Sequence, residues 1–379
     1  MRVAWVHTNA RTILVTGEDL AAEEQALALE RAGVDVRRVA ASVHERAAEL
    51  HATAVLIGGR NRSYADAIVA TEPDVIHVHK WYPWLGRRDL SRLDRPVVAT
   101  LHNYRPLCPV GTLFRDGGTC TECVGRAPVP AVRHGCYDGS RIRTVPLALS
   151  RPYPAARHPL FSAVSMFVAP SRRAADVLTG LARVPPERVR VVPSFVDDLG
   201  VGPSRPPSGW LFVGQLEPTK GIEQLVRRWP RGEQLTVVGT GSLERDLTRW
   251  ADGTGVRLVG RRGRREVRQL MADSLGLLFP STYLETQGLV VGEAASVGCP
   301  VVALQGTAGG DQVAEHGFGV VMESLEELDA ALATVASDRD AFSAAATGYW
   351  CGELGGERWV ARMRSVYAEV TADGVRPID

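Results

Sequence analysis

The stretch FPSTYLETQGLVVGEAASVGCPVV, residues 279–302, decides the fold of the second half of the chain. A short apolar run ends at Pro280, a polar loop carries Glu285, and Gly288 precedes a helix expected to start near Leu289. Glycine lets the backbone approach another group closely at such a turn. The first amides of a helix have no acceptor within it and suit an anion such as a diphosphate. The stretch therefore predicts a strand, a ligand-binding loop and a helix.

Two carboxylates in this stretch, Glu285 and Glu293, lie eight residues apart. Glu285 precedes the predicted helix start, and Glu293 falls roughly one turn inside the helix. One carboxylate can then accept the hydroxyl groups of a sugar, and the other the vicinal hydroxyls of a ribose. Two such glutamates alone favour a plainer interpretation, a helix-start acid followed by a surface acid. The surrounding strand, turn and helix reverse that preference.

A cationic residue comes from an earlier segment, FVGQLEPTKGIEQLV (212–226), which predicts a strand, a turn and a helix beginning near Lys220 and Gly221. A lysine at this turn can neutralise the charge that develops on a leaving diphosphate. The alternative is a solvated turn lysine. Only Lys80 and Lys220 are lysines among the 44 basic residues of the chain, and this scarcity favours a function for Lys220.

Short apolar strands alternate with helical stretches in both halves of the chain, which predicts an α/β protein with two parallel-sheet, Rossmann-like domains. We expect the domains at 1–196 and 209–356, joined by a linker rich in Pro, Gly and Ser at 197–208. An amphipathic helix at 357–370 is expected to pack back on the first domain. Ligands of such sheets bind at the carboxyl ends of the strands, so we expect the site in a cleft that the two domains face.

The composition limits the classes of function. A length of 379 residues is too long for one ordinary core, and a net charge of +1 argues against nucleic-acid binding. No run of apolar residues approaches the length of a membrane span, and the first strand lacks the apolar core of a signal peptide. We therefore expect a cytoplasmic protein.

Taken together, the motifs resemble the retaining family 4 glycosyltransferases. The matching stretches of the second half are VGQLEPTKG, VVGTGSLERDL, VRLVGRRGRREVRQLMADSLGLLFPS and ETQGLVVGEAASVGCPVV, in the usual order. PDVIHVHKWYP and TLHNYRPLCPVGTLFRDGGTC are similar to the first domain of that family. The resemblance implies the GT-B fold, an acceptor-binding first domain and a second domain that holds a nucleotide-sugar donor. It also implies retaining transfer of a hexose, with no catalytic divalent metal.

The resemblance assigns roles to individual residues. Glu285 would contact the hydroxyls of the donor hexose, Lys220 the diphosphate and Glu293 the ribose. His102, at the end of a predicted strand, would sit by the reacting centre, and a structural role for it is equally weighted. The other donor-binding residues that it implies are Gly17, Gln215, Arg261, Arg262, Thr286, Gln287, Gly288 and Leu289.

The chain departs from the family pattern at two places. Most members have an arginine where this chain has Gln215, so a phosphate charge is missing or supplied elsewhere. A glycine pair is usual where this chain has Thr16 and Gly17. UDP is the expected nucleotide, and no residue excludes GDP. The acceptor stays open among polysaccharide precursors, lipids and small natural products.

Four cysteines, Cys108, Cys120, Cys123 and Cys136, have the spacing C-x11-C-x2-C-x12-C. A cytoplasmic chain should not depend on disulfides, and four thiols with a close C-x2-C pair can form a tetrahedral zinc site. Such a closed site has no open coordination position, so its zinc would be structural. Reduced, buried thiols are the main alternative and disulfides the third.

The stretch from 124 to 175 holds eight arginines and a single acid, Asp138. One interpretation is attraction to anionic lipid headgroups at the inner face of the membrane, or to a phosphorylated acceptor. The plainer interpretation, a solvated basic face of an arginine-rich protein, is slightly favoured by the sequence alone.

Three other classes of protein fit parts of the sequence. Gly239, Thr240 and Gly241 follow a strand as in a dinucleotide oxidoreductase, but the sixth position of that motif is Glu244. A nucleotide-sugar epimerase of the same architecture would keep the donor pocket. A non-catalytic protein that binds sugar nucleotides would be consistent with Gln215, although the retained Lys220 and the two glutamates oppose it.

Overall fold

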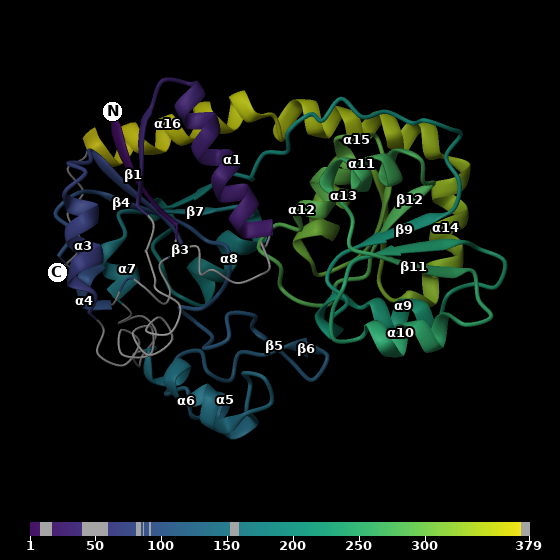
Figure 1. Ribbon diagram of the computed structural model, residues 1–379, viewed down its shortest axis with the longest axis horizontal. Helices are drawn as coiled ribbons and strands as arrows, with labels where there is room; N and C mark the ends of the chain where they lie inside the picture. The colour runs from purple at the N-terminus through teal and green to yellow at the C-terminus, as the bar shows by residue number, and fades with distance from the viewer. Residues whose placement is uncertain are drawn as a thin grey trace. The chain divides into compact units, whose positions relative to one another are not determined.

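The computed structural model describes residues 1–7, 17–39, 60–80, 85, 87–90, 92–151 and 159–372 (Figure 1). The chain forms two compact units. Unit 1 comprises residues 1–115, 120–194 and 357–379, and unit 2 comprises residues 116–119 and 195–356. The predicted first domain ended at 196. Val196 instead belongs to unit 2, because its amide donates to the carbonyl of Leu354 (3.0 Å) and its carbonyl accepts the indole N–H of Trp350 (2.8 Å).

Unit 1 is built on a six-stranded parallel sheet with the order β2-β1-β3-β4-β7-β8. Its strands are β1 (Arg2–His7), β2 (Asp35–Val39), β3 (Val75–Lys80), β4 (Val97–Thr100), β7 (Met166–Ala169) and β8 (Val189–Val191). Its helices are α1 (Gly17–Arg31), α3 (Arg62–Val69), α4 (Arg87–Leu90), α7 (Pro159–Ala163), α8 (Arg172–Gly180), the 3-10 turn η2 (Pro186–Arg188) and α16 (Gly356–Ala372). Between β4 and β7 the chain forms β5 (Phe114–Arg115), β6 (Gly118–Thr119), α5 (Val129–His134) and α6 (Arg141–Leu149).

The last helix, α16, packs on the sheet of unit 1 (Figure 1). Its buried side chains include Met363, Val366 and Tyr367, which recur at helical spacing and form one apolar face. The Tyr367 hydroxyl lies 2.6 Å from Nδ1 of His77 on β3. Glu369 forms an ion pair with Arg190 on β8. The helix therefore completes the core of unit 1 although it follows unit 2 in the sequence.

Unit 2 has a second six-stranded parallel sheet, with the order β11-β10-β9-β12-β13-β14. Its strands are β9 (Trp210–Val213), β10 (Leu235–Val238), β11 (Val256–Gly260), β12 (Gly276–Phe279), β13 (Val301–Leu304) and β14 (Gly319–Met322). Its helices are α9 (Ile222–Arg227), α10 (Glu244–Ala251), α11 (Arg264–Ala272), α12 (Leu289–Ala295), α13 (Ala308–His316), α14 (Leu328–Ser337) and α15 (Arg339–Glu353), with 3-10 turns η3 (Pro218–Lys220) and η4 (Leu325–Glu327).

The sheet of unit 2 is buried on both faces. Along β9, Trp210 and Phe212 belong to one apolar cluster, whereas Leu211 belongs to the other. Successive side chains of a strand point to opposite faces, so the continuous apolar run of β9 fills both clusters. The two parallel, Rossmann-like sheets confirm the predicted fold class. Among the described residues, no helix is both long and apolar enough to cross a membrane.

Candidate active site

The loops that follow β9 and β12 meet at the carboxyl edge of the unit 2 sheet, because these two strands are neighbours. Gly221 ends the first loop with a φ of +66°, and a Cβ there would lie 1.9 Å from the carbonyl oxygen of Pro280. The amide of Thr282 donates to the carbonyl of Thr219 at 3.2 Å. The missing side chain at 221 thus lets the two loops touch backbone to backbone.

This close approach brings together the two residues predicted to act on the donor. The Lys220 ammonium lies 2.5 Å from Oε1 of Glu285, and the Ser281 hydroxyl donates to the same oxygen at 2.8 Å. Glu285 is only 6% exposed, whereas the Lys220 side chain is 23% exposed. Nζ of Lys220 also lies 5.1 Å from the ring centre of Tyr283. The carboxylate is therefore fixed by its partners, and the ammonium keeps a path to solvent.

The start of α12 is held next to this ion pair. Gly288 caps the helix in the left-handed region (φ +77°), and a Cβ there would lie 3.4 Å from Oε2 of Glu285. Gln287 is buried, and its carbonyl accepts a hydrogen bond from the side-chain amide of Gln312. The Tyr349 hydroxyl in turn donates to Gln312 (2.9 Å). The predicted residues Thr286, half-buried, and Leu289, the first of α12, continue this loop.

Glu293, predicted to hold a ribose, lies on α12 and contacts a residue that the sequence did not single out. Its Oε2 is 3.3 Å from Nη1 of Arg268, which is only 2% exposed on α11. A carboxylate has more acceptor positions than this one contact uses. The arrangement therefore fixes the orientation of Glu293, and its ribose contact stays a prediction.

The other predicted donor residues of unit 2 lie at the same edge of the sheet, after strands β9 and β11. Gln215 follows β9 and is exposed. Arg261 and Arg262 follow β11, also exposed, and Arg262 pairs with Glu266 at 2.9 Å. No contact within the described part of the chain joins these three residues to the Lys220–Glu285 pair.

The glycines that suggested a dinucleotide motif have a packing role. A Cβ at Gly239 would lie 1.8 Å from the carbonyl oxygen of Gly214, and one at Gly241 would lie 2.5 Å from that of Leu216. Each glycine therefore lets the loop after β10 lie against the loop after β9. This contact accounts for both glycines without a dinucleotide.

In unit 1, His102 belongs to a polar cluster at the carboxyl ends of β1, β3 and β4. Its Nε2 lies 2.9 Å from Nδ1 of His79. Asp19, near the start of α1, lies 2.9 Å from Nε2 of His7 and 3.5 Å from Nζ of Lys80. The predicted Gly17 is the first residue of α1, two positions before Asp19, and its neighbour Thr16 lies outside the described residues.

The histidines of this cluster are held neutral. Burial, together with the nearby Lys80 cation, lowers the pKa of His102 to about 4. Burial also lowers the pKa of His79 and, less strongly, that of His7 against the opposing effect of Asp19. Burial raises the pKa of Glu18, next to Asp19. At neutral pH the cluster therefore offers neutral imidazoles for hydrogen bonding beside a lysine and an aspartate.

The buried histidines make unit 1 sensitive to acid. Burial lowers the pKa of His77 to about 3 and that of His102 to about 4, whereas an unfolded histidine titrates near 6.5. As the pH falls below 6.5, these histidines bind protons in the unfolded state but stay neutral in the folded state. Each such histidine lowers the free energy of unfolding by up to about 1.4 kcal/mol per pH unit. Chemical unfolding of the protein between about pH 7 and pH 5 is expected to show this decrease in the free energy of unfolding. The decrease should be smaller for His102→Asn, which lacks one of the buried histidines. An unchanged free energy of unfolding across that pH range would contradict the prediction.

Sequence reasoning missed several residues that the structure places at these sites: Ser281, Arg268 and Gln312 in unit 2, and His7, Asp19 and His79 in unit 1. Two signals were available. The alternation in VIHVHK puts His77 and His79 on one face of β3, and Lys80 is one of two lysines. Contacts such as Arg268–Glu293, which join two helices, have no comparable signal in the sequence.

Comparison with known proteins supports this architecture. Residues 15–198 match the family described as Glycosyltransferase Family 4, and residues 207–345 match Glycosyl transferases group 1. The glycogen synthase of Mycobacterium tuberculosis is 26% identical over 284 residues, which cover 70% of this chain. The chain spans about 61% of the length of that curated relative.

Solved structures with the same fold include Alr3699/HepE of Anabaena in complex with UDP. It is 16% identical, with a TM-score of 0.67 over 97% of this chain and 100% of that chain. Sucrose-phosphate synthase of Thermosynechococcus elongatus is 15% identical, with a TM-score of 0.70 over 98% and 99% of the two chains.

The two parallel sheets and these matches define a glycosyltransferase of the GT-B class. The matched regions together cover most of both units. The chain belongs to the family 4-type glycosyltransferases.

Proposed function

We propose that the protein transfers a hexose from a nucleotide diphosphate sugar, UDP-hexose in the first instance, to a hydroxyl of an acceptor with retention at the anomeric carbon. The observation that carries this proposal is the Lys220–Glu285 pair, 2.5 Å apart, on two loops that share the carboxyl edge of one sheet. Ligands of open α/β sheets bind at this edge.

The pair can act on two parts of a sugar nucleotide at once. An ammonium group has three N–H donors, so Lys220 can keep its bond to Glu285 and direct another donor at a diphosphate oxygen. Oε2 of Glu285 lies on the side of Gly288 and can accept a sugar hydroxyl. Ser281 holds the other carboxylate oxygen in place. In this proposal the leaving diphosphate charge is met by Lys220 and not by a divalent metal ion.

Retention follows, in this proposal, from a displacement on one face of the sugar. The leaving diphosphate oxygen takes the proton of the incoming hydroxyl as that hydroxyl attacks the anomeric carbon, so no protein carboxylate has to form a covalent bond. The protein stabilises the leaving charge and positions the reactants. We place the neutral His102 as a hydrogen-bond partner of a donor hydroxyl, and the acceptor with unit 1.

The choice of UDP is supported by relatives with this fold. Alr3699/HepE of Anabaena was solved with UDP and also with UDP-glucose. Thermal unfolding in the presence of UDP-, GDP- and dTDP-sugars tests this choice. A ligand at 100 times its Kd stabilises the folded protein by about 2.7 kcal/mol, so the bound nucleotide should raise Tm clearly. We expect UDP-glucose to raise Tm the most. No shift with any of the three would contradict donor binding.

Incubation with donor alone separates transfer from epimerisation. We expect slow hydrolysis of the donor to a free sugar of unchanged anomeric configuration, read by NMR, and no change at other carbons. Conversion of the intact UDP-hexose to its epimer would assign the chain to an epimerase. Donor binding without hydrolysis, and without transfer to any acceptor in a panel of glycans and lipids, would favour a binding protein.

A further inference from the structure

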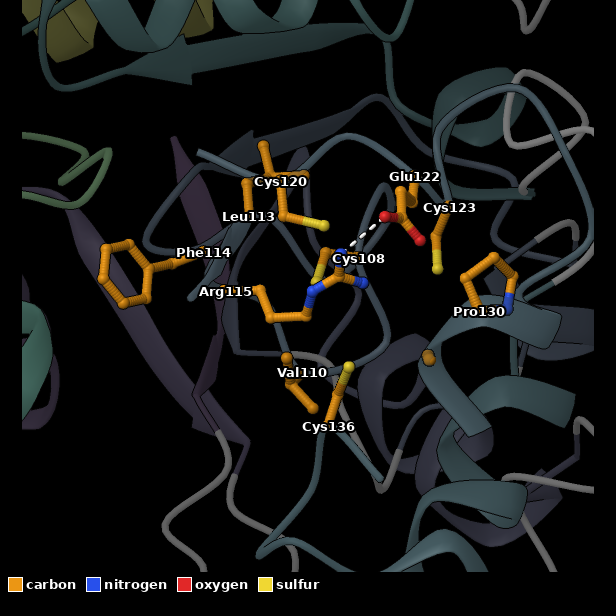
Figure 2. Close-up of a pocket in the computed structure, with 11 residues that line it drawn as sticks. Cys108, Val110, Leu113, Phe114, Arg115, Cys120, Glu122, Cys123, Pro130 and Cys136 are labelled. Atoms are coloured by element: carbon orange, nitrogen blue, oxygen red, sulfur yellow. Dashed lines mark hydrogen bonds and ion pairs between the residues drawn. The ribbon is translucent and has the colours of Figure 1, made fainter. Parts of the chain in front are cut away.

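The segment between β4 and α6 of unit 1 gathers four thiols around one small pocket. Cys108, Cys120, Cys123 and Cys136 all line a cavity of about 20 Å³, with space for one water-sized guest. Figure 2 shows their sulfur atoms turned toward its interior. The four thiols are also close enough for their charges to interact. Such a cavity, lined by four soft ligands, has the size and chemistry of a single-ion site.

The backbone around the thiols consists of tight turns. Asp116 and Gly117 both have positive φ, 51° and 81°, and close the hairpin between β5 and β6. A hydrogen bond from the amide of Gly111 to the carbonyl of Cys108 (2.9 Å) closes a turn on one side of this hairpin. A bond from the amide of Val124 to the carbonyl of Thr121 (2.9 Å) closes another turn on the far side. From 101 to 128 the only regular elements are the two-residue strands of the hairpin, so little secondary structure fixes the cysteines.

A buried cation next to the thiols gives independent evidence for negative charge at this site. Arg151 is 4% exposed, and its Nη2 donates to the carbonyls of Cys123 (2.6 Å) and Arg126 (2.9 Å). Its Nε and Nη1 are buried and have no hydrogen-bond partner among the described residues. Its charge interacts with Cys123 and Cys108. An unbalanced buried guanidinium is costly, and a thiolate cluster would balance it.

The acid that lines the same pocket is already paired. Glu122 lies 2.5 Å from Arg115 through one carboxylate oxygen and 3.3 Å from His134 through the other. The dashed line in Figure 2 marks the pair with Arg115. Both carboxylate oxygens of Glu122 therefore already have partners, so the four thiols are the proposed ligand set.

We propose that Cys108, Cys120, Cys123 and Cys136 bind one structural zinc ion as thiolates, with Arg151 as the neighbouring counter-charge. Among the described residues no three side chains are arranged at coordinating distances, so the four thiols would have to draw closer together to bind the ion. Binding releases the thiol protons to solvent and leaves a centre of charge −2, which the Arg151 guanidinium partly offsets. The ion would hold the turns of residues 101–128 against α5.

Metal analysis of the full chain, purified without chelator, tests the proposal. We expect about one zinc per chain, and less than about 0.3 equivalents would overturn it. Cys120→Ser/Cys123→Ser is expected to lose the zinc, whereas Cys299→Ser and Cys351→Ser, which change the two cysteines outside the cluster, should keep it. Equal zinc in all variants would show that the metal lies elsewhere.

Three further measurements use the wild-type protein and so do not depend on the folding of a variant. Cobalt(II) added to the stripped wild-type protein should produce the intense visible absorption of a tetrahedral thiolate site, and zinc chloride should raise its Tm. Alkylation of the wild-type protein without reductant, followed by mass spectrometry, identifies disulfides. Two disulfides among these four residues, or four thiols that gain nothing from zinc, would each refute the site.

A second inference concerns the outer face of α5 and α6, which lie side by side (Figure 1). Of the ten large hydrophobic residues that are exposed in the described chain, five lie between 129 and 149. Ile142 (85% exposed), Val145 and Leu149 form one face of α6, and its other side buries Leu147 and Ala148. The exposed residues Arg133, Arg141 and Arg143 lie on the same two helices, and Arg143 pairs with Asp138 at 2.8 Å. Helix α6 is thus apolar on two sides: one side is buried in the protein, and the other is exposed.

We infer that this α5–α6 surface docks on a membrane that contains anionic phospholipid. Apolar side chains would enter the headgroup boundary, and arginines would meet phosphates, which matches the exposed pattern of both kinds of residue. The excess of positive charge beside the apolar face matches the negative headgroups of anionic phospholipids, whereas a protein partner would not require it.

Sedimentation with phosphatidylcholine vesicles, with and without phosphatidylglycerol, tests this surface at low and high salt. We expect binding only to the anionic vesicles at low salt, reduced about tenfold by Ile142→Ser/Leu149→Ser. Val69→Ser removes an apolar residue that is 44% exposed elsewhere in unit 1 and should bind like the wild type. Absence of binding at low salt, or equal binding of both variants, would remove the inference.

Discussion

Turnover of a UDP-hexose is expected to fall by about 100-fold or more in both Lys220→Met and Glu285→Gln, the scale of one lost charge-stabilising donor at a reacting centre. Lys220→Met removes the cation that meets the leaving diphosphate. Glu285→Gln keeps the shape of the side chain and removes the charge that orients both the ammonium and a sugar hydroxyl. Initial rates at saturating donor measure the effect on kcat, and titration of UDP separates it from binding.

Matched controls lie a few residues away on α9. Arg227→Met also removes a cation, and Glu223→Gln also neutralises a glutamate, from a part-exposed ion pair of 3.0 Å whose arginine also lies over the ring of Trp250. Exposed pairs contribute little to stability, so both controls should turn over like the wild type. Thermal unfolding is also needed, because Lys220→Met leaves the nearly buried Glu285 without its cation. A normally folded Lys220→Met or Glu285→Gln with wild-type kcat would refute the catalytic role.

The second large effect is expected from Gly221→Ala, which touches no ligand in our proposal. Alanine at a φ of +66° is strained, and its Cβ would lie 1.9 Å from the carbonyl oxygen of Pro280. The loops after β9 and β12 must then separate. We expect unit 2 to lose about 2–4 kcal/mol of stability. Turnover should fall about 10- to 100-fold, because Lys220 moves away from Glu285.

Gly253→Ala is the matched control for backbone strain. Gly253 has a φ of +71°, but a Cβ there would meet nothing within 4 Å. Gly253→Ala should lower the stability only by the strain of an alanine in the left-handed region, about 1–2 kcal/mol. Its turnover should stay unchanged. Urea unfolding and initial rates of both variants check the comparison. Equal losses in the two variants would show that the contact with Pro280 has no effect beyond strain.

The sequence predicted the fold well because the information is local. Buried strands such as β9 and β12 are continuous apolar runs, and the turns after them carry the glycines that close approach requires. The chemistry of the donor loops was local too, so Lys220 and Glu285 were singled out separately. Their mutual contact was not predicted, because the two residues lie 65 positions apart and meet only because β9 and β12 are neighbours in the sheet.

Other features of the site arise only from packing. Glu293 meets Arg268 because α11 and α12 lie together, and no spacing in the sequence reports that contact. The motif at Gly239–Gly241 has two physical explanations, a ligand or a neighbouring loop, and only the coordinates distinguish them. The cluster of His7, His79, His102 and Asp19 joins three strand ends and a helix. The alternation in β3 gave a hint of it, but the partners lie far apart in the chain.

The position of α16 has a consequence for the order in which the protein is made. By residue 194 a ribosome has synthesised every strand of the first sheet, yet Tyr367, the partner of His77, is still untranslated. Residues 195–356 form nearly all of unit 2 as one uninterrupted run and can mature as they emerge from the exit tunnel. Unit 1 is therefore translated first but completed last, when α16 emerges. Until then its apolar strands must stay soluble while unit 2 is translated.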